Sequence, residues 1–324
     1  MPLHLLMTAQ LPALVIDALE RDFRLHRLWE AENADALIAE IEGHVEAIVT
    51  AVPILAESAG PRVDGALMAR FSRLRLVANL GVGYDNIDAE WAFAHAVALT
   101  NTPDVLTEET ADTAFGLLLN TVRELSAAER YLRAGKWLER PYRLTASLRG
   151  RTLGVFGLGR IGKAIARRAE AFGLTVIYHN RRPVPDIGYR YCPDLLELAR
   201  ACDILMVAAP GGPETDGLIG AEALDALGPD GVLINIARGS IVDEDALIAA
   251  LREGRIHGAG LDVFAREPEV PPALLEADRV VLLPHVGSAS QVTRDAMCQL
   301  VIDNVRRWAE GLPLLTPVRP TGGV

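Results

Sequence analysis

Three side chains that could move a proton and hold an anion stand in the last third of the chain. Arg238, Glu267 and His285 each follow, by a few residues, an apolar run that predicts a buried parallel strand. Open α/β sheets bind ligands at the edge where such strands end, so we expect the three to lie close together. Singly, each has a structural explanation, as a surface charge, a loop residue before proline, or a structural histidine. Together they predict a catalytic set.

Such a set suits the reduction of a 2-oxo acid. A protonated imidazole is the natural proton donor near neutral pH. A neighbouring carboxylate stabilises the imidazolium and raises its pKa above the reference of about 6.5. An arginine can hold the substrate carboxylate and polarise the carbonyl. The hydride has to come from a cofactor.

A glycine-rich turn predicts where a dinucleotide cofactor binds. Gly157-Leu158-Gly159-Arg160-Ile161-Gly162 follows the apolar run of residues 152–156 and opens a helical pattern. The first glycine permits the tight turn, the second lets the backbone approach the pyrophosphate, and the third lets helix and strand pack closely. The helix N-terminus then offers free N–H groups to the phosphates.

The next strand ends in a basic sequence that favours NADP(H) over NAD(H). NAD sites carry an acid about 20 residues beyond the glycines, where it accepts from the ribose 2′-OH. This chain has Asn180-Arg181-Arg182 there. Asn180 can bond without charge, and two guanidinium groups can clamp a 2′-phosphate. The alternatives are an exposed basic turn that touches nothing, and NAD(H) as a second cofactor.

Two α/β domains are the organisation that length and pattern predict. The chain has 324 residues, of which half are hydrophobic and only 5% aromatic. Strand-like runs alternate with helical segments from end to end, which indicates doubly wound parallel sheets. The runs lie at residues 3–7, 47–51, 74–79, 97–101, 152–156, 174–178, 204–208, 232–236, 259–263 and 280–283.

Helical patterns and loop composition fill in the rest. One long helix is predicted from Glu108 to about Tyr131, and an amphipathic helix over residues 291–308. The tail, residues 313–324, is rich in proline and glycine and is expected to be loose.

Several classes of function are disfavoured by composition. A net charge of −11 makes nucleic acid an improbable partner. Three cysteines, Cys192, Cys202 and Cys298, show no CxxC spacing, so neither a disulfide framework nor a metal site is expected. No apolar run reaches membrane-spanning length, and the N-terminus lacks a basic signal region, so we predict a cytoplasmic protein.

With these residues in view, the chain resembles the D-2-hydroxyacid dehydrogenase family, and within it the glyoxylate/hydroxypyruvate reductases. The resemblance covers nearly the whole chain. Its motifs are Gly81-Val82-Gly83-Tyr84-Asp85-Asn86-Ile87-Asp88, Thr110-Ala111-Asp112-Thr113-Ala114, the glycine turn, Asn235-Ile236-Ala237-Arg238-Gly239, Gly260-Leu261-Asp262-Val263-Phe264, Glu267-Pro268 and Pro284-His285-Val286-Gly287-Ser288.

The resemblance implies a role for each matching residue. Arg238, Glu267 and His285 match the catalytic set of the family. The substrate would lie against the backbone of Val82 and Gly83, with Leu80 nearby. In addition to the glycine turn and Asn180–Arg182, the resemblance implies further cofactor contacts. These are Thr110 and Asp262 at the nicotinamide, Ala209 and Pro210 at the adenosine ribose, Thr215, which would close their loop, Ala237 and Gly287.

The resemblance also implies an architecture. A Rossmann dinucleotide-binding domain, residues 101–286, would be inserted into a flavodoxin-like substrate domain of residues 1–100 and 287–324, with the active site in the cleft. A homodimer is implied, joined through the long helix and the region of Arg140.

Two alternatives stay open at this point. One is a dinucleotide-sensing binding module of the same fold, against which the complete catalytic set argues. The other is a related dehydrogenase acting on another 2-hydroxy acid. Leu80, Tyr84 and Trp137 are candidate determinants of substrate choice, and for Trp137 packing at an interface is an equal alternative.

Overall fold

The computed structural model describes residues 2–52 and 60–319. The chain divides into two compact units: an outer unit of residues 1–106 and 290–324, and a central unit of residues 107–289. Among the described residues, no helix combines the length and the apolarity needed to cross a membrane.

The outer unit contains a five-stranded parallel sheet in the order β2-β1-β3-β4-β5. This is the flavodoxin-like order that was predicted. Its strands are β1 (His4–Met7), β2 (Arg24–Arg27), β3 (Val45–Ala51), β4 (Leu76–Leu80) and β5 (Ala98–Thr100). Its helices are α1 (Ala13–Glu20), η1 (Leu28–Glu30), α2 (Ala34–Ile41), α3 (Gly65–Ala69), α4 (Ala89–Ala94) and α12 (Gln291–Ala309), with η1 a 3-10 helix.

The C-terminal tail is fixed along part of its length, which corrects the expectation of a loose segment. Pro317 forms an antiparallel bridge with Thr100, and the Val318 N–H donates to the Leu99 carbonyl at 2.8 Å. The tail therefore extends the edge of the sheet at β5. Residues 320–324 lie outside the described part of the chain.

The central unit contains a seven-stranded parallel sheet in the order β12-β11-β10-β9-β6-β7-β8, the Rossmann arrangement. Its strands are β6 (Thr152–Phe156), β7 (Thr175–His179), β8 (Arg190–Tyr191), β9 (Ile204–Val207), β10 (Val232–Asn235), β11 (Gly258–Leu261) and β12 (Val280–Leu282). Its helices are α5 (Thr107–Arg123), α6 (Leu125–Arg133), η3 (Lys136–Leu138), α7 (Arg160–Ala171), α8 (Leu195–Ala201), α9 (Ala221–Leu227), η4 (Gly239–Ile241), α10 (Glu244–Arg252) and α11 (Pro272–Leu275).

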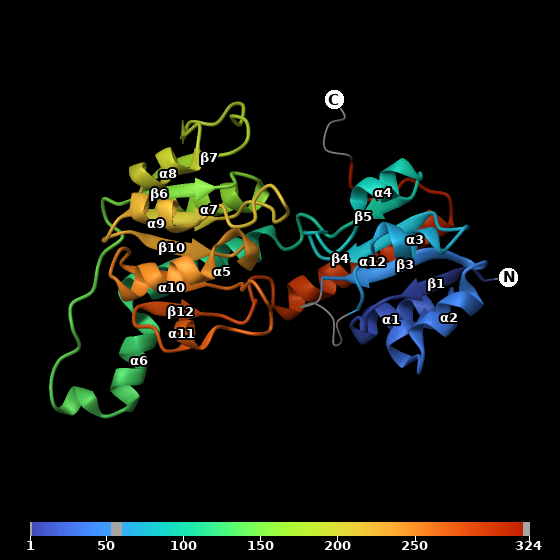
Figure 1. The fold of residues 1–324 in the computed structure, drawn as a ribbon, viewed down its shortest axis with the longest axis horizontal. Helices are drawn as coiled ribbons and strands as arrows, with labels where there is room; N and C mark the ends of the chain where they lie inside the picture. The colour runs from blue at the N-terminus through green and yellow to red at the C-terminus, as the bar shows by residue number, and fades with distance from the viewer. Residues whose placement is uncertain (1, 53–59, 320–324) are drawn as a thin grey trace. The chain divides into compact units, whose positions relative to one another are not determined.

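Both faces of this sheet are buried. Successive residues of a strand point to opposite faces, so Val232 and Ile234 pack in the core with α5 and α7, whereas Leu233 packs with α8, α9 and α10. Figure 1 shows these two helical layers on either side of the strands. Double burial explains why the strands read as continuous apolar runs.

The predicted long helix is interrupted. Glu124 adopts a left-handed conformation with φ of 52°, which ends α5 at Arg123 and starts α6 at Leu125. The buried Glu124 carboxylate accepts from the Tyr142 hydroxyl at 2.8 Å and from Arg143 Nε at 2.7 Å. These contacts stabilise a backbone conformation that a non-glycine residue rarely adopts.

Candidate active site

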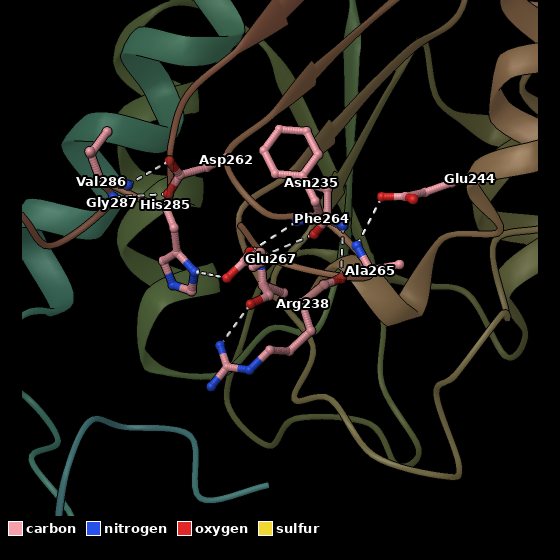
Figure 2. Close-up of polar contacts among 11 residues, drawn as sticks. Asn235, Arg238, Glu244, Asp262, Phe264, Ala265, Glu267, His285, Val286 and Gly287 are labelled. Atoms are coloured by element: carbon pink, nitrogen blue, oxygen red, sulfur yellow. Dashed lines mark hydrogen bonds and ion pairs between the residues drawn. The ribbon is translucent and has the colours of Figure 1, made fainter. Parts of the chain in front are cut away.

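The imidazole of His285 and the carboxylate of Glu267 form a hydrogen-bonded pair. Nδ1 of His285 lies 2.8 Å from Oε2 of Glu267, and both side chains are half-buried. An ionised carboxylate only accepts hydrogen bonds, so Nδ1 carries the shared proton. The other ring nitrogen, Nε2, points away from Glu267 (Figure 2). The ring is thus oriented with Nε2 available to a reactant.

The surroundings of Glu267 keep its carboxyl group ionised. Burial is the strongest influence and raises the pKa, but it is outweighed by the hydrogen bond to His285 and by the positive charges of His285 and Arg238. The Phe264 N–H also donates to Oε1 at 2.9 Å. The net effect is a pKa below the usual value for glutamate.

Arg238 lies just beyond the end of β10, on a turn that Asn235 fixes from within. The Asn235 side chain donates to the Arg238 carbonyl at 2.8 Å and accepts from the Ala237 N–H at 3.0 Å. The guanidinium donates back to the Ala237 carbonyl at 2.8 Å. Figure 2 shows Arg238 on the same side of the sheet edge as Glu267 and His285.

A close backbone approach connects the Arg238 turn to the Glu267 loop. A Cβ atom placed on Gly239 would lie 1.8 Å from the carbonyl carbon of Phe264 and 2.3 Å from the Ala265 nitrogen. No side chain larger than glycine fits there. The Ala265 N–H also donates to the Glu244 carboxylate at 2.8 Å. The two loops that carry Arg238 and Glu267 therefore have a fixed relation.

Asp262 holds the turn that presents His285. Its two oxygens accept from the N–H groups of Val286 and Gly287 at 2.7 and 2.8 Å, and its carbonyl accepts from the His285 N–H at 2.8 Å. Its side chain is buried, and burial raises its pKa against the opposing effect of these N–H groups. A Cβ on Gly287 would lie 3.4 Å from Thr110, so Thr110, Asp262 and Gly287 are neighbours.

The glycine turn fits a dinucleotide. Gly157 has φ of 100°, and a Cβ there would lie 2.4 Å from the Ala209 nitrogen. A Cβ on Gly162 would lie 2.2 Å from the Gly157 carbonyl oxygen, whereas one on Gly159 would meet nothing within 4 Å. Two glycines thus serve packing and the third opens space at the start of α7, where Arg160 and Ile161 begin the helix without a side-chain cap. This is the cradle that a pyrophosphate requires.

The basic sequence after β7 has contacts that the sequence does not reveal. Asn180 Oδ1 accepts from the Leu158 N–H at 2.6 Å, so this side chain helps to hold the glycine turn. Arg181 forms an ion pair with Glu214, Nη1 to Oε2, at 2.7 Å. Arg182 is exposed.

The loop after β9 passes beside the glycine turn. Ala209 is buried against Gly157. Thr215 closes the loop on itself, because its hydroxyl lies 2.9 Å from the Pro210 carbonyl and 3.1 Å from that of Gly212.

In the outer unit, two asparagines fix the turn expected to bind a substrate carboxylate. Asn79 Nδ2 donates to the Gly83 carbonyl at 2.9 Å, and Asn101 Nδ2 donates to the Val82 carbonyl at 2.8 Å. Leu80, the last residue of β4, is buried.

Sequence reasoning missed Asn79, Asn101 and Asn235 as residues that position the site. Asn79 and Asn235 are fully buried at the carboxyl ends of β4 and β10. A polar residue that closes an apolar run is the signal that could have identified them, since a buried amide needs hydrogen-bond partners.

Comparison with known proteins agrees with this fold. Residues 115–287 match the sequence profile of the D-isomer specific 2-hydroxyacid dehydrogenase family, NAD binding domain. The chain belongs to this family. The match confirms the predicted family and dinucleotide-binding function of this region.

Individual relatives match over nearly their full length. Glyoxylate/hydroxypyruvate reductase A of Arabidopsis thaliana is 42% identical over 97% of this chain and 98% of its own. Hydroxyphenylpyruvate reductase of Plectranthus scutellarioides is 44% identical over 93% and 94%. An NADPH-dependent glyoxylate/hydroxypyruvate reductase of Sinorhizobium meliloti, solved with NADP and malonate, is 48% identical with a TM-score of 0.90, covering 98% of this chain and 97% of that one.

Proposed function

We propose that the protein reduces a small 2-oxo acid, glyoxylate or hydroxypyruvate, to the D-2-hydroxy acid with NADP(H). The observation that carries the proposal is the arrangement of Arg238, Glu267 and His285 at the strand ends of one sheet that also carries the glycine turn. Relatives named for this reaction match the whole chain at 42% and 48% identity.

His285 is the proton donor in this proposal. With Nδ1 bonded to Glu267, protonated Nε2 would face the carbonyl oxygen of the substrate and donate to it as reduction proceeds. The Glu267 carboxylate stabilises the imidazolium and fixes the ring. When bound, the nicotinamide supplies the hydride.

Arg238 would bind the substrate carboxylate and polarise the carbonyl, because a guanidinium is a planar donor to two oxygens. The second half of the carboxylate site would be the turn at Val82 and Gly83. Its carbonyls accept from Asn101 and Asn79, which fixes the backbone of the turn, and its N–H groups would donate to the anion.

The preference for NADP over NAD is the second part of the proposal. It is supported by the absence of an acid at the end of β7 and by two exposed guanidinium groups there. The solved relative from Sinorhizobium meliloti holds NADP, at 48% identity. The other implied cofactor contacts, at Thr110, Asp262, Gly287, Ala209, Pro210 and Ala237, stay predictions.

A homodimer is the assembly we propose. Large apolar side chains stand exposed on α6, on η3 and on the segment that follows, and Figure 1 shows α6 leading away from the sheet of the central unit. Leu138 is 93% exposed and Leu144 is 99% exposed. Apolar surface of this kind on one arm indicates an interface. The cytoplasmic location stays a prediction.

The direct test follows the absorbance of the reduced cofactor with purified protein, with glyoxylate or hydroxypyruvate, and with NADPH and NADH in parallel. We expect faster turnover with NADPH. The His285→Ala variant should lose nearly all turnover while it binds NADPH as before, because the substitution removes the proton donor and leaves the residues of the glycine turn in place. Normal turnover in that variant would refute the assignment of the proton donor.

Two other activities are separated by the same assay. The relative that reduces hydroxyphenylpyruvate makes a bulkier 2-oxo acid the second candidate substrate, and it belongs in the panel. Tight cofactor binding with no turnover on any 2-oxo acid would favour a dinucleotide-sensing module instead. The complete Arg238, Glu267 and His285 set argues against that outcome.

A further inference from the structure

The residue expected to bind a 2′-phosphate already has an anionic partner. Arg181 Nη1 lies 2.7 Å from Glu214 Oε2, and the side chains are 73% and 75% exposed. Arg181 stands just beyond β7, whereas Glu214 stands in the loop that follows β9. The ion pair therefore joins two segments that both lie beside the glycine turn.

The loop that carries Glu214 is fixed on both sides of that residue. At its start, Ala209 packs against Gly157. At its end, the Gly217 N–H donates to the Ser240 carbonyl at 2.7 Å, and the Ser240 hydroxyl donates to Asp216 at 2.6 Å. The backbone on both sides of Glu214 is thus held in place, and from it the exposed carboxylate reaches Arg181.

We infer that Glu214 is a specificity-determining residue, whose carboxylate competes with the cofactor 2′-phosphate for Arg181 and so limits the preference for NADP over NAD. The inference rests on the proposed NADP(H) function and deepens it. A 2′-phosphate must displace Glu214 or share the guanidinium with it. NAD carries an uncharged 2′-hydroxyl at that position, which does not compete for Arg181 and leaves the ion pair with Glu214 intact.

Charge decides the direction of the effect. A phosphate carries nearly two negative charges and three acceptor oxygens, so it can displace a single carboxylate from an exposed ion pair, which is a weak interaction. The displaced Glu214 remains a like charge near the phosphate. Its carboxylate therefore weakens NADP binding, and it has no comparable effect on NAD.

The test measures dissociation constants for NADP⁺ and NAD⁺ by isothermal titration calorimetry, with wild type and Glu214→Gln. Glutamine keeps the size and loses the charge. We expect NADP⁺ to bind about 2- to 10-fold more tightly, the range of one or two exposed charge interactions, and NAD⁺ to change less than twofold. The gain should shrink at high salt, because the lost repulsion is screened.

Asp225→Asn is the matched control. Asp225 forms an exposed ion pair with Arg255 at 2.6 Å in the same unit, so the variant makes the same change in net charge at another pair. It should leave both dissociation constants unchanged. An equal gain from Asp225→Asn would show that net charge alone is responsible and would overturn the inference.

Arg181→Ala separates failure of this inference from failure of the proposed cofactor preference. If Arg181→Ala weakens NADP⁺ and spares NAD⁺ while Glu214→Gln changes neither, Arg181 binds the phosphate and the competition by Glu214 is refuted. If Arg181→Ala changes neither cofactor, the proposed role of Arg181 fails and the inference falls with it. In the double variant, the gain from Glu214→Gln should be smaller than in wild type.

Discussion

Two glycines of the nucleotide turn, Gly162 and Gly159, should respond differently to the same added methyl group. In Gly162→Ala the new Cβ would lie 2.2 Å from the Gly157 carbonyl oxygen, so backbone must move by about 1 Å. Overpacking of this kind costs about 1–3 kcal/mol. In a domain of about 180 residues each kcal/mol lowers Tm by about 2–4 °C, so we expect a clear fall in Tm together with weaker cofactor binding.

Gly159→Ala should leave stability unchanged and still impair binding. The added Cβ meets nothing within 4 Å, and the backbone there, φ −82° and ψ −157°, is open to alanine. Alanine is a poorer helix N-cap than glycine, which lowers the free energy of unfolding by about 0.5–1 kcal/mol. Alanine also reduces the conformational freedom of the unfolded chain, which raises the free energy of unfolding by about the same amount. A methyl in the space of the pyrophosphate should cost at least one charge-assisted hydrogen bond, about 1.5–3 kcal/mol, or tenfold or more in Kd.

Gly220→Ala is the control for this pair. Gly220 caps α9 with nearly the same backbone, φ −98° and ψ −165°, and its Cβ would lie 3.6 Å from its nearest neighbour. Differential scanning fluorimetry without cofactor and fluorescence titration with NADPH give the two readouts. Unchanged NADPH affinity in Gly159→Ala, or unchanged Tm in Gly162→Ala, would refute the division of roles derived from the geometry.

Three further outcomes are expected. Gly239→Ala should lower Tm and should lower kcat/KM by about 100-fold or more. The reason is that the new Cβ would lie 1.8 Å from the Phe264 carbonyl carbon, so the loops that carry Arg238 and Glu267 would separate. Activity near that of wild type would contradict the close approach. Replacing Leu138 and Leu144 together by Glu should convert the proposed dimer to a monomer in sedimentation velocity, and a dimer that persists would exclude this arm as the interface. The pKa of His26 is lowered by burial and by the charges of His4, Arg24 and His44, against the opposing charge of Glu40. The folded state therefore favours the neutral imidazole. The contribution of His26 to the free energy of unfolding is full above about pH 6.5 and falls as the pH drops below that value. In His26→Gln the fall in Tm between pH 7.5 and 5.5 should therefore be smaller, and an undiminished fall would assign the effect to other groups.

Most of the strands that sequence reasoning located are buried on both faces, although the edge strand β12, whose residues are only partly buried, was located too. The run at residues 152–156 coincides with β6, and the others differ from the observed strands at their ends. β2 and β8 were missed. β2, Arg24–Arg27, lies at the edge of its sheet with partly exposed polar side chains, and β8 has only two residues. An edge strand has one neighbour and one solvated side, so it needs no apolar run.

The break between α5 and α6 could not be predicted from the local sequence. No glycine or proline stands near Glu124, and the apolar pattern continues on both sides. The partners that stabilise the turn, Tyr142 and Arg143, lie 18 and 19 residues further along the chain. Asn120 adds a local contact, since its side chain accepts from the Ser126 N–H at 2.9 Å. Periodicity reports the buried face of a helix and not the tertiary contacts that end it.

The same limit applies at the site. Residue types that must touch a reactant can be identified by their chemistry, and this located Arg238, Glu267 and His285 at a common sheet edge. The groups that hold the loops of the site are harder to identify, because any donor or acceptor with the right reach suffices. Asn79, Asn101 and Asn235 each stand near the end of an apolar run, but the carbonyl that each one binds is known only from the structure.

Cofactor choice shows most clearly why residue types alone are insufficient. The sequence places Asn180 and two arginines where an NAD enzyme has an acid, and that pattern alone predicts a site of purely positive charge. In the structure, Asn180 supports the glycine turn, and an acid is present after all, supplied by Glu214 from 33 residues beyond Arg181. The local charge that a 2′-phosphate would meet at Arg181 is therefore a difference between neighbouring groups of opposite sign. Preference for NADP should then depend on salt and on the state of the Glu214 loop, and not only on the sequence after β7.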